Sequence, residues 1–273
     1  MFRVERRQTG LQAAARTLDL IYLITGRSVR RGHSNALIGL VSNILQTLIF
    51  IGVFYVLARL LGMRSLAIRG DYILYLMTGI FTFMTNTKTM GAVAGAEGPA
   101  SPMMQHAPMT TAISISSAAL AALYTQVLSM VVILGVYHLA VTPLEIHDPA
   151  GVAAMVFLAW LNGTCVGLLV LSLKPWAPAL TGMASTIYSR ANLIFSGKMF
   201  VANTLSYHLL KFFDWNPLFH IIDQARGFAF INYYPHNTTI LYPLYVSLAL
   251  LMLGLMGEFY GRRRVSISWF AGK

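Results

Sequence analysis

An arginine inside an apolar stretch is the strongest chemical signal in the sequence. Arg190 stands about midway along the apolar residues 178–201, between Tyr188 and Asn192. An ionised side chain at such a depth in a bilayer costs at least about 2.5 kcal/mol unless it faces water, protein or an opposite charge. We therefore expect Arg190, Tyr188 and Asn192 to line a conduit for an anionic substrate. The alternatives are that Arg190 packs against carbonyl groups or an acid of another helix, or points outward to the membrane surface.

The sequence does not predict nucleotide hydrolysis. A phosphate-binding loop needs an upstream glycine, and a lysine followed by serine or threonine. The nearest segment, residues 196–199, reads SGKM and lacks both the upstream glycine and the hydroxyl residue. We expect no catalytic residues and no ATPase activity in this chain, so any ATP-driven work would need a partner.

Metal and acid–base chemistry are not predicted either. The seven histidines are scattered without the spacing of metal ligands, and Cys165 is the single cysteine. An enzyme that works inside a membrane on lipid-linked sugars should carry paired acids or a phosphate-binding cluster facing one side. The nine acidic residues are too dispersed for that pattern.

Composition places the chain among helical membrane proteins. Hydrophobic residues make up 56% of it and charged residues 11%, against about a quarter charged in soluble domains. The net charge of +11 comes from basic residues that flank apolar runs, which favours anionic lipids and an anionic cargo over nucleic acid as partners. We predict an all-α fold with six transmembrane helices, over residues 36–61, 72–90, 109–141, 151–173, 178–201 and 239–260.

Charge asymmetry orients this predicted fold. Seven arginines precede the first span, and three arginines and Lys273 follow the last. Because basic residues gather on the cytoplasmic side of membrane proteins, both ends are expected in the cytoplasm. We divide the chain into a cytoplasmic N-terminus, residues 1–34, and a single transmembrane domain, residues 35–273. No removable signal peptide is expected, since no small-residue cleavage site follows a short apolar core.

The N-terminus is predicted to hold an amphipathic helix. Residues 8–24 place apolar side chains at helical spacing, with Gln12, Arg16 and Asp19 elsewhere around the axis. A helix of this kind lies in the plane of the membrane interface. The alternative is a solvated leader helix.

Residues 203–234 are too apolar for a free loop and too polar to cross a bilayer. They contain two short helical patterns, over residues 204–213 and 217–226. A helix of about ten residues rises about 15 Å, half the apolar thickness of a bilayer. We therefore predict a re-entrant helical hairpin that dips into the membrane and returns on the same side.

Three residues mark the second helix of this hairpin. Asn216 can accept hydrogen bonds from its free N–H groups, and Pro217 suits its first turn. Gly227 is placed to end it.

The loop at residues 91–108, GAVAGAEGPASPMMQHAP, is expected on the cytoplasmic side. Ser101 and Pro102 can start a short helix there. Such a helix is suited to docking another subunit, and methionines adapt to a groove. The alternative is a connector without a partner. The residues of the predicted docking helix are Pro102, Met103, Met104, Gln105 and His106.

The sequence resembles one family of transporters. Residues 215–226 read WNPLFHIIDQAR. This segment resembles the W-N-P-L-x-H sequence with a downstream arginine in the membrane subunits of ABC type-2 exporters, in particular those that export capsular polysaccharide and O-antigen. Residues 75–83, YLMTGIFTF, and residues 30–46, RRGHSNALIGLVSNILQ, resemble the second span and the start of the first span in that family. The likeness covers most of the chain by layout, and the Asn-Pro-Leu region is its specific part.

The resemblance implies a permease subunit in a bacterial inner membrane that exports a lipid-linked, anionic capsular or surface polysaccharide. Two copies would form a homodimer and pair with two separate ATP-binding subunits. ATP and Mg²⁺ would be bound there, so no cofactor is expected in this chain. The docking helix would couple the two kinds of subunit, and a periplasmic partner could continue the export path. The hairpin would gate the periplasmic side through Trp215, Asn216, Pro217, His220 and Arg226.

Other functions stay open at this point. The same fold could export a lipid, a drug or haem. From another class, the chain could be a membrane-embedded enzyme that processes lipid-linked sugars. A proton-driven carrier would need ionisable residues in several spans, whereas Arg190 is essentially alone.

Overall fold

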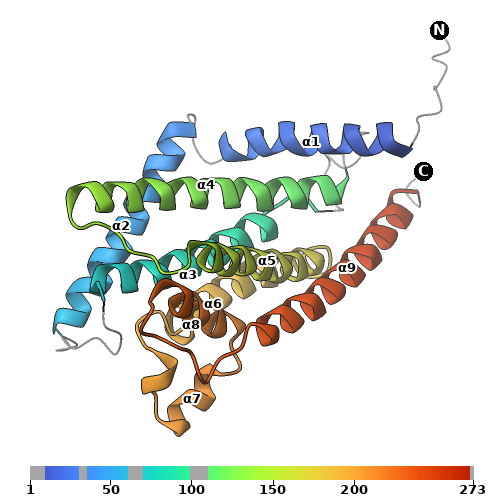
Figure 1. Ribbon diagram of the computed structural model, residues 1–273. Coiled ribbons are helices and arrows are strands. Elements are labelled where there is room, and N and C mark those ends of the chain that lie inside the picture. The colour runs from blue at the N-terminus through green and yellow to red at the C-terminus, as the bar shows by residue number, and fades with distance from the viewer. Residues whose placement is uncertain (1–9, 31–35, 61–69, 99–109, 271–273) are drawn as a thin grey trace.

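The computed structural model describes residues 10–30, 36–60, 70–98 and 110–270. Throughout these residues the regular structure is helical, with no strand (Figure 1). The helices are α1 (Gly10–Arg30), α2 (Ala36–Leu60), α3 (Tyr72–Ala94), α4 (Thr111–Ala140), α5 (Pro149–Leu173), α6 (Pro178–Phe195), the 3₁₀ turn η2 (Ala202–Thr204), α7 (Tyr207–Phe213), α8 (Pro217–Ala229) and α9 (Leu241–Phe270).

Four of the described helices are long and apolar enough to cross a membrane. Each holds at least 18 residues with few charges, and α4, with 30 residues, rises about 45 Å, more than a bilayer core requires. The four segments are Leu37–Leu60, Thr111–Ala140, Pro149–Leu173 and Leu241–Arg263. This confirms the predicted all-α fold and the class of helical membrane proteins.

Helix α3 lies at the centre of the bundle. It packs against α2, α4, α5, α6 and α8, and every residue from 74 to 86 is buried within the chain. Its hydroxyl side chains donate along the helix itself, as Thr82 does to the carbonyl of Thr78 at 2.8 Å. Because protein surrounds residues 74–86 of α3, this part of the helix can carry more polar residues than a helix that faces lipid. That explains why α3 is less apolar than the four segments above.

Side chains of the preceding turns fix where the helices begin. Asp71 accepts from the backbone N–H of Ile73 at the start of α3, and Asp148 from that of Gly151 at the start of α5. Thr110 caps α4 in the same way. These caps satisfy N–H groups that have no partner within the helix.

Several helix ends differ from the prediction, and those of α6 and of the N-terminal helix α1 differ by six residues each. α6 ends at Phe195 instead of continuing to residue 201, because Gly197 adopts a φ of 67° that helices do not use. A Cβ atom on Gly197 would also lie 2.3 Å from the ring of Phe219. The N-terminal helix is longer than predicted and runs to Arg30. α1 lies along α4, where the Ser117 hydroxyl donates to the carbonyl of Ile21 at 3.2 Å. Its placement in a membrane interface stays a prediction.

The backbones of α3 and α5 approach each other closely. A Cβ atom on Gly163 would lie 2.4 Å from the carbonyl oxygen of Asn86, and one on Gly167 would lie 2.7 Å from that of Met90. Both contacts are to backbone, which a side-chain rotation does not relieve. The two glycines therefore set the distance between the two helices.

We expect Gly163→Val to destabilise the protein, because the added atoms force α3 and α5 apart. Overpacking of this kind costs about 1–3 kcal/mol or more. Thermal unfolding of the purified protein in detergent measures the effect. Gly135→Val is the matched control, since no heavy atom lies within 4 Å of a Cβ atom built on Gly135. Equal melting temperatures for the two variants would contradict the close α3–α5 contact.

Candidate functional site

The short helices α7 and α8 form a hairpin between α6 and α9 (Figure 1). We call residues 207–229 the α7–α8 hairpin. None of the seven residues of α7 is buried, whereas nine residues of α8 are, and α8 packs against α3, α5 and α9. One helix is thus part of the core and the other lies on its surface.

Asn216 begins α8, as predicted. Its side-chain oxygen accepts from the N–H of Leu218 at 3.0 Å, and Pro217 occupies the first turn. Its amide also donates to the side-chain oxygen of Asn192 and to the carbonyl of Phe195, both at 2.9 Å. One buried side chain therefore caps α8 and fastens it to the end of α6.

The end of α8 was predicted wrongly. The helix continues past Gly227 to Ala229. A Cβ atom on Gly227 would lie 2.8 Å from Cδ of Pro235, so glycine is needed here for close packing and not for a helix end. The helical periodicity of the sequence does not reveal a contact with a residue such as Pro235 that lies beyond the helix.

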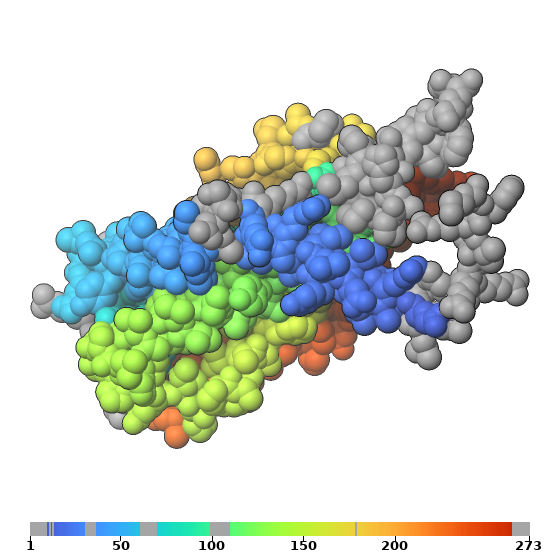
Figure 2. Space-filling view, turned by 90° about the horizontal axis from the view of Figure 1, so that it is seen from above, coloured from blue at the N-terminus to red at the C-terminus, as the bar shows by residue number. Residues whose placement is uncertain are grey.

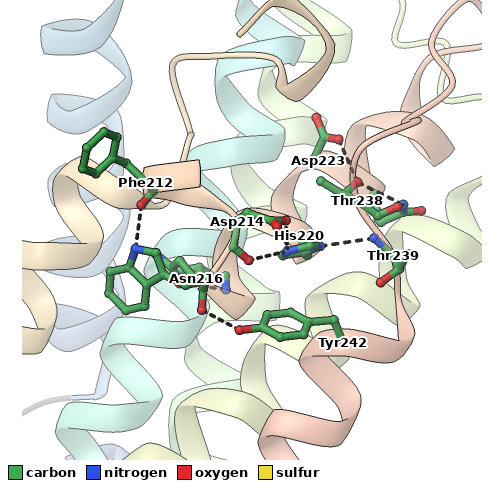
Figure 3. A network of polar contacts seen from close by, with 11 residues as sticks. Phe212, Asp214, Asn216, His220, Asp223, Thr238, Thr239 and Tyr242 are labelled. Atoms are coloured by element: carbon green, nitrogen blue, oxygen red, sulfur yellow. Dashed lines mark hydrogen bonds and ion pairs between the residues drawn. The ribbon is translucent and has the colours of Figure 1, made fainter. Parts of the chain in front are cut away.

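His220 joins the turn to the start of α9 (Figure 3). Its Nδ1 accepts from the N–H of Thr239 at 3.2 Å, so its Nε2 carries the proton and lies 2.8 Å from the carbonyl of Asp214. The Tyr242 hydroxyl donates to the carbonyl of Trp215 at 2.7 Å. Both contacts tie the turn between α7 and α8 to α9.

Asp223 is a buried carboxylate that the sequence analysis did not single out. It accepts from the N–H of Ala202 at 3.2 Å, the hydroxyl of Tyr233 at 2.6 Å and the hydroxyl of Thr238 at 2.8 Å. Burial, and then the charge of Asp223, raise the pKa of Tyr233 above its usual range, so this phenol stays a donor. With three donors around it, Asp223 organises the chain on both sides of α8.

Arg226 is fully buried, at 1% exposure. Its guanidinium donates to the carbonyls of Gly197, Lys198 and Phe200 and lies 4.0 Å from the ring centre of Tyr75. These carbonyls follow the end of α6, where no helical N–H reaches them. Arg226 therefore satisfies the turn after α6 and has no free face for a substrate within this chain.

Trp215 is the exposed member of the predicted gate. Its indole N–H donates to the carbonyl of Phe212 at 2.6 Å, and its ring centre lies 6.0 Å from that of Phe195. Phe213 also contacts Phe195, at 5.9 Å between ring centres. Aromatic contacts thus hold α7 against the end of α6, while Trp215, Asn216, Pro217, His220 and Arg226 lie together around the turn and α8.

The three predicted conduit residues lie on two faces of α6. Tyr188 and Asn192 point into the bundle: the Tyr188 hydroxyl donates to the side-chain oxygen of Asn86 at 3.0 Å, and Asn192 meets Asn216. Arg190 is exposed. Two positions along a helix amount to about 200° around its axis, so Arg190 faces away from the other two.

A chain of buried amides extends from Tyr188 across the bundle. Asn86 of α3 donates to the side-chain oxygen of Asn162 at 2.9 Å, and Asn162 of α5 donates to the hydroxyl of Ser247 on α9 at 2.9 Å. These contacts join four helices. The sequence signal for these bonds is an asparagine inside an apolar run. The sequence does not show its partner, because the bonded residues Asn86 and Asn162, and Asn162 and Ser247, are more than 70 positions apart.

The predicted docking residues Pro102, Met103, Met104, Gln105 and His106 lie outside the described residues. Within the part of the chain that the structure describes, no group of three or more His, Cys, Asp or Glu side chains could hold a metal ion. A comparison of the chain with protein-family models and with curated proteins finds no match.

Asn216→Ala is expected to destabilise the hairpin by about 2–4 kcal/mol. The loss combines one helix cap, about 1 kcal/mol, with a buried carbonyl left unpaired, about 1–3 kcal/mol. Ser206→Ala at the start of α7 is the matched control, because the Ser206 side chain makes no capping bond. Limited proteolysis and thermal unfolding in detergent would compare them. Wild-type stability and protease resistance in both variants would show that Asn216 does not hold α8 to the end of α6.

Proposed function

We propose that the protein is the membrane subunit of an ATP-driven exporter, with a lipid-linked, anionic surface polysaccharide as its cargo. Two copies would surround the export path, and separate ATPase subunits would supply the driving force. The resemblance of residues 215–226 to capsule-export permeases supports this proposal, and so does the position of that segment in the fold.

The α7–α8 hairpin is the observation that carries the proposal. At 1.5 Å per residue, α7 rises about 10 Å and α8 about 20 Å, and neither reaches across a bilayer core of about 30 Å. The pair follows α6 and precedes α9 in the chain, and it is held to both by the hydrogen bonds of Asn216 to Asn192 and of His220 to Thr239. A half-depth hairpin of this kind suits a gate at one end of a path.

Six crossings fit the lengths of the helices. To the four apolar segments we add α3, with 23 residues, and α6, with 18 residues or about 27 Å. α3 is enclosed by protein and tolerates polar residues. An even number of crossings brings both ends of the chain to one side, the cytoplasm by the distribution of arginines.

The outward face of α6 is the proposed wall of the export path. Arg190 lies on it among exposed apolar side chains such as Ile187 and Ile194. An arginine directed at lipid is costly. A second copy, or an aqueous path between two copies, would relieve that cost and offer a positive charge to an anionic cargo.

Purification of the tagged protein from its native membrane tests the function. We expect a stoichiometric ATPase subunit to accompany it, and the complex in vesicles to move a lipid-linked polysaccharide when ATP is supplied. Activity of the isolated chain on a lipid-linked sugar without ATP would instead identify the membrane-embedded enzyme. Transport of only a lipid, a drug or haem would retain the exporter and reject the polysaccharide.

In the same vesicles, Arg190→Gln is expected to lower export roughly tenfold, the scale of one hydrogen bond to a charged group. Arg16→Gln, a change of an exposed charge on α1 and outside the hairpin, serves as the control. Unchanged export at equal protein level in the Arg190 variant would remove Arg190 from the path.

The side of the membrane reached by the hairpin is open to a labelling test. Cys165, the single cysteine, is buried and is not expected to react with a labelling reagent. Trp215→Cys therefore introduces the one exposed thiol. We expect a membrane-impermeant maleimide to label this variant from the periplasm and not from the cytoplasm. Labelling from the cytoplasm alone would invert the hairpin and exclude it as a periplasmic gate.

A further inference from the structure

A large cavity lies among α1, α2, α3 and α4, away from the hairpin. Its volume is about 960 Å³, at the upper end of the range for small-molecule sites. The space exists because the facing turns of α3 and α4 carry small side chains, among them Gly91, Ala92, Ala118 and Ala122. Figure 2 shows α1, α2 and α4 next to one another on this side of the molecule.

The walls of the cavity combine positive charge with apolar surface. Arg27 and Arg30, from the last turn of α1, and Lys88 of α3 contribute three cationic side chains. Glu97 is the one carboxylate in the described lining. Leu37 and Leu40 of α2 supply apolar walls.

Polar groups deeper in the cavity are already held by protein. The Asn43 amide donates to the side chains of Gln126 at 2.6 Å and Ser129 at 2.8 Å, and Lys88 donates to Gln46. These contacts fix α2 against α3 and α4 without filling the space between them. Arg27 and Arg30 are exposed, so the arginines are positioned to meet a ligand.

The position of the cavity along the helices points to a class of ligand. It is lined by residues 37–43 in the first turns of α2, and by residues 88–97 in the last turns of α3 and the three positions after it. Both segments mark the predicted cytoplasmic edge of the bilayer, where anionic lipid headgroups gather. From Leu37 in the lining, a stripe of exposed apolar side chains at a spacing of four runs along α2 through Val41 to Leu45.

We propose that this cavity binds the phosphate-bearing headgroup of an anionic membrane lipid, whose acyl chains lie along the Leu37–Val41–Leu45 stripe of α2. Three cations against one carboxylate select a negative headgroup over a zwitterionic one. A second copy of this chain would bring further positive charge to the same place and is not favoured. The bound lipid fastens α1 to the bundle, and this role is independent of what the protein exports.

Native mass spectrometry of the full chain in detergent tests the site, with phosphatidylglycerol and phosphatidylcholine added in turn. We expect phosphatidylglycerol to be retained in preference to phosphatidylcholine. The double variant Arg27→Gln, Arg30→Gln should bind phosphatidylglycerol about thirtyfold more weakly, given the contribution of each basic residue to anionic lipid binding. The double variant Arg16→Gln, Arg59→Gln has the same net charge, changes no lining residue, and should bind as the wild type does.

A second variant tests the cavity without changing charge. Gly91 lines the cavity, and no heavy atom lies within 4 Å of a Cβ atom built on it, so Gly91→Leu fills the space while the fold is kept. It should reduce phosphatidylglycerol binding, whereas Gly135→Leu, equally open and outside the lining, should not.

Three outcomes would overturn the proposal. The first is equal retention of the two lipids by the wild type. The second is unchanged binding in both the Arg27, Arg30 double variant and Gly91→Leu. The third is full displacement of the lipid by millimolar inorganic phosphate, which would identify a site for the free anion instead of a lipid. Circular dichroism of each variant separates loss of binding from loss of fold.

Discussion

The structure depends on satisfying polar groups where water does not reach. In a bilayer, a buried amide or carbonyl without a partner costs several kcal/mol, so each polar side chain in the bundle needs a partner from the chain itself. Asn86 and Asn162 meet this requirement across α3 and α5, and Arg226 meets it for three carbonyls after α6. Where the partner comes from another helix, as for Asn86 and Asn162, the bond that removes the cost also fixes which helices are neighbours.

This constraint explains why α3 differs in polarity from the helices around it. α2, α4, α5 and α9 are apolar enough to face lipid, whereas α3 is enclosed and carries asparagine and several threonines. The glycines of α5 bring it close enough to α3 for the amides to meet. Small residues and polar residues thus act together, as is usual where membrane helices associate without a hydrophobic driving force.

Local signals in the sequence were sufficient for the class of fold and for most helix boundaries. Apolar runs gave the long helices, and Asn216 with Pro217 marked the start of α8 because a cap acts on residues two or three positions away. The end of α8 was predicted wrongly at Gly227, because this glycine packs against Pro235, in the segment that follows α8. Asp223, and the opposite facing of Arg190 and Tyr188, depend on tertiary contacts that periodicity does not encode. The cavity among α1 to α4 was equally out of reach, since it arises from four separate segments.

The hydrogen bonds of Arg226 to the turn after α6 make α8 more firmly attached to the bundle than α7. The Asn216 amide connects α8 to Asn192 and Phe195 of α6, and the Arg226 guanidinium connects it to Gly197, Lys198 and Phe200 in the turn after α6, five hydrogen bonds in all. Separating these elements would leave several buried oxygens without donors at once, which favours their staying together. α7 is attached chiefly through ring contacts of Phe213 and Trp215. Aromatic rings can slide past one another without leaving a buried polar atom unpaired. Within the hairpin, α7 can therefore shift at a lower cost than α8.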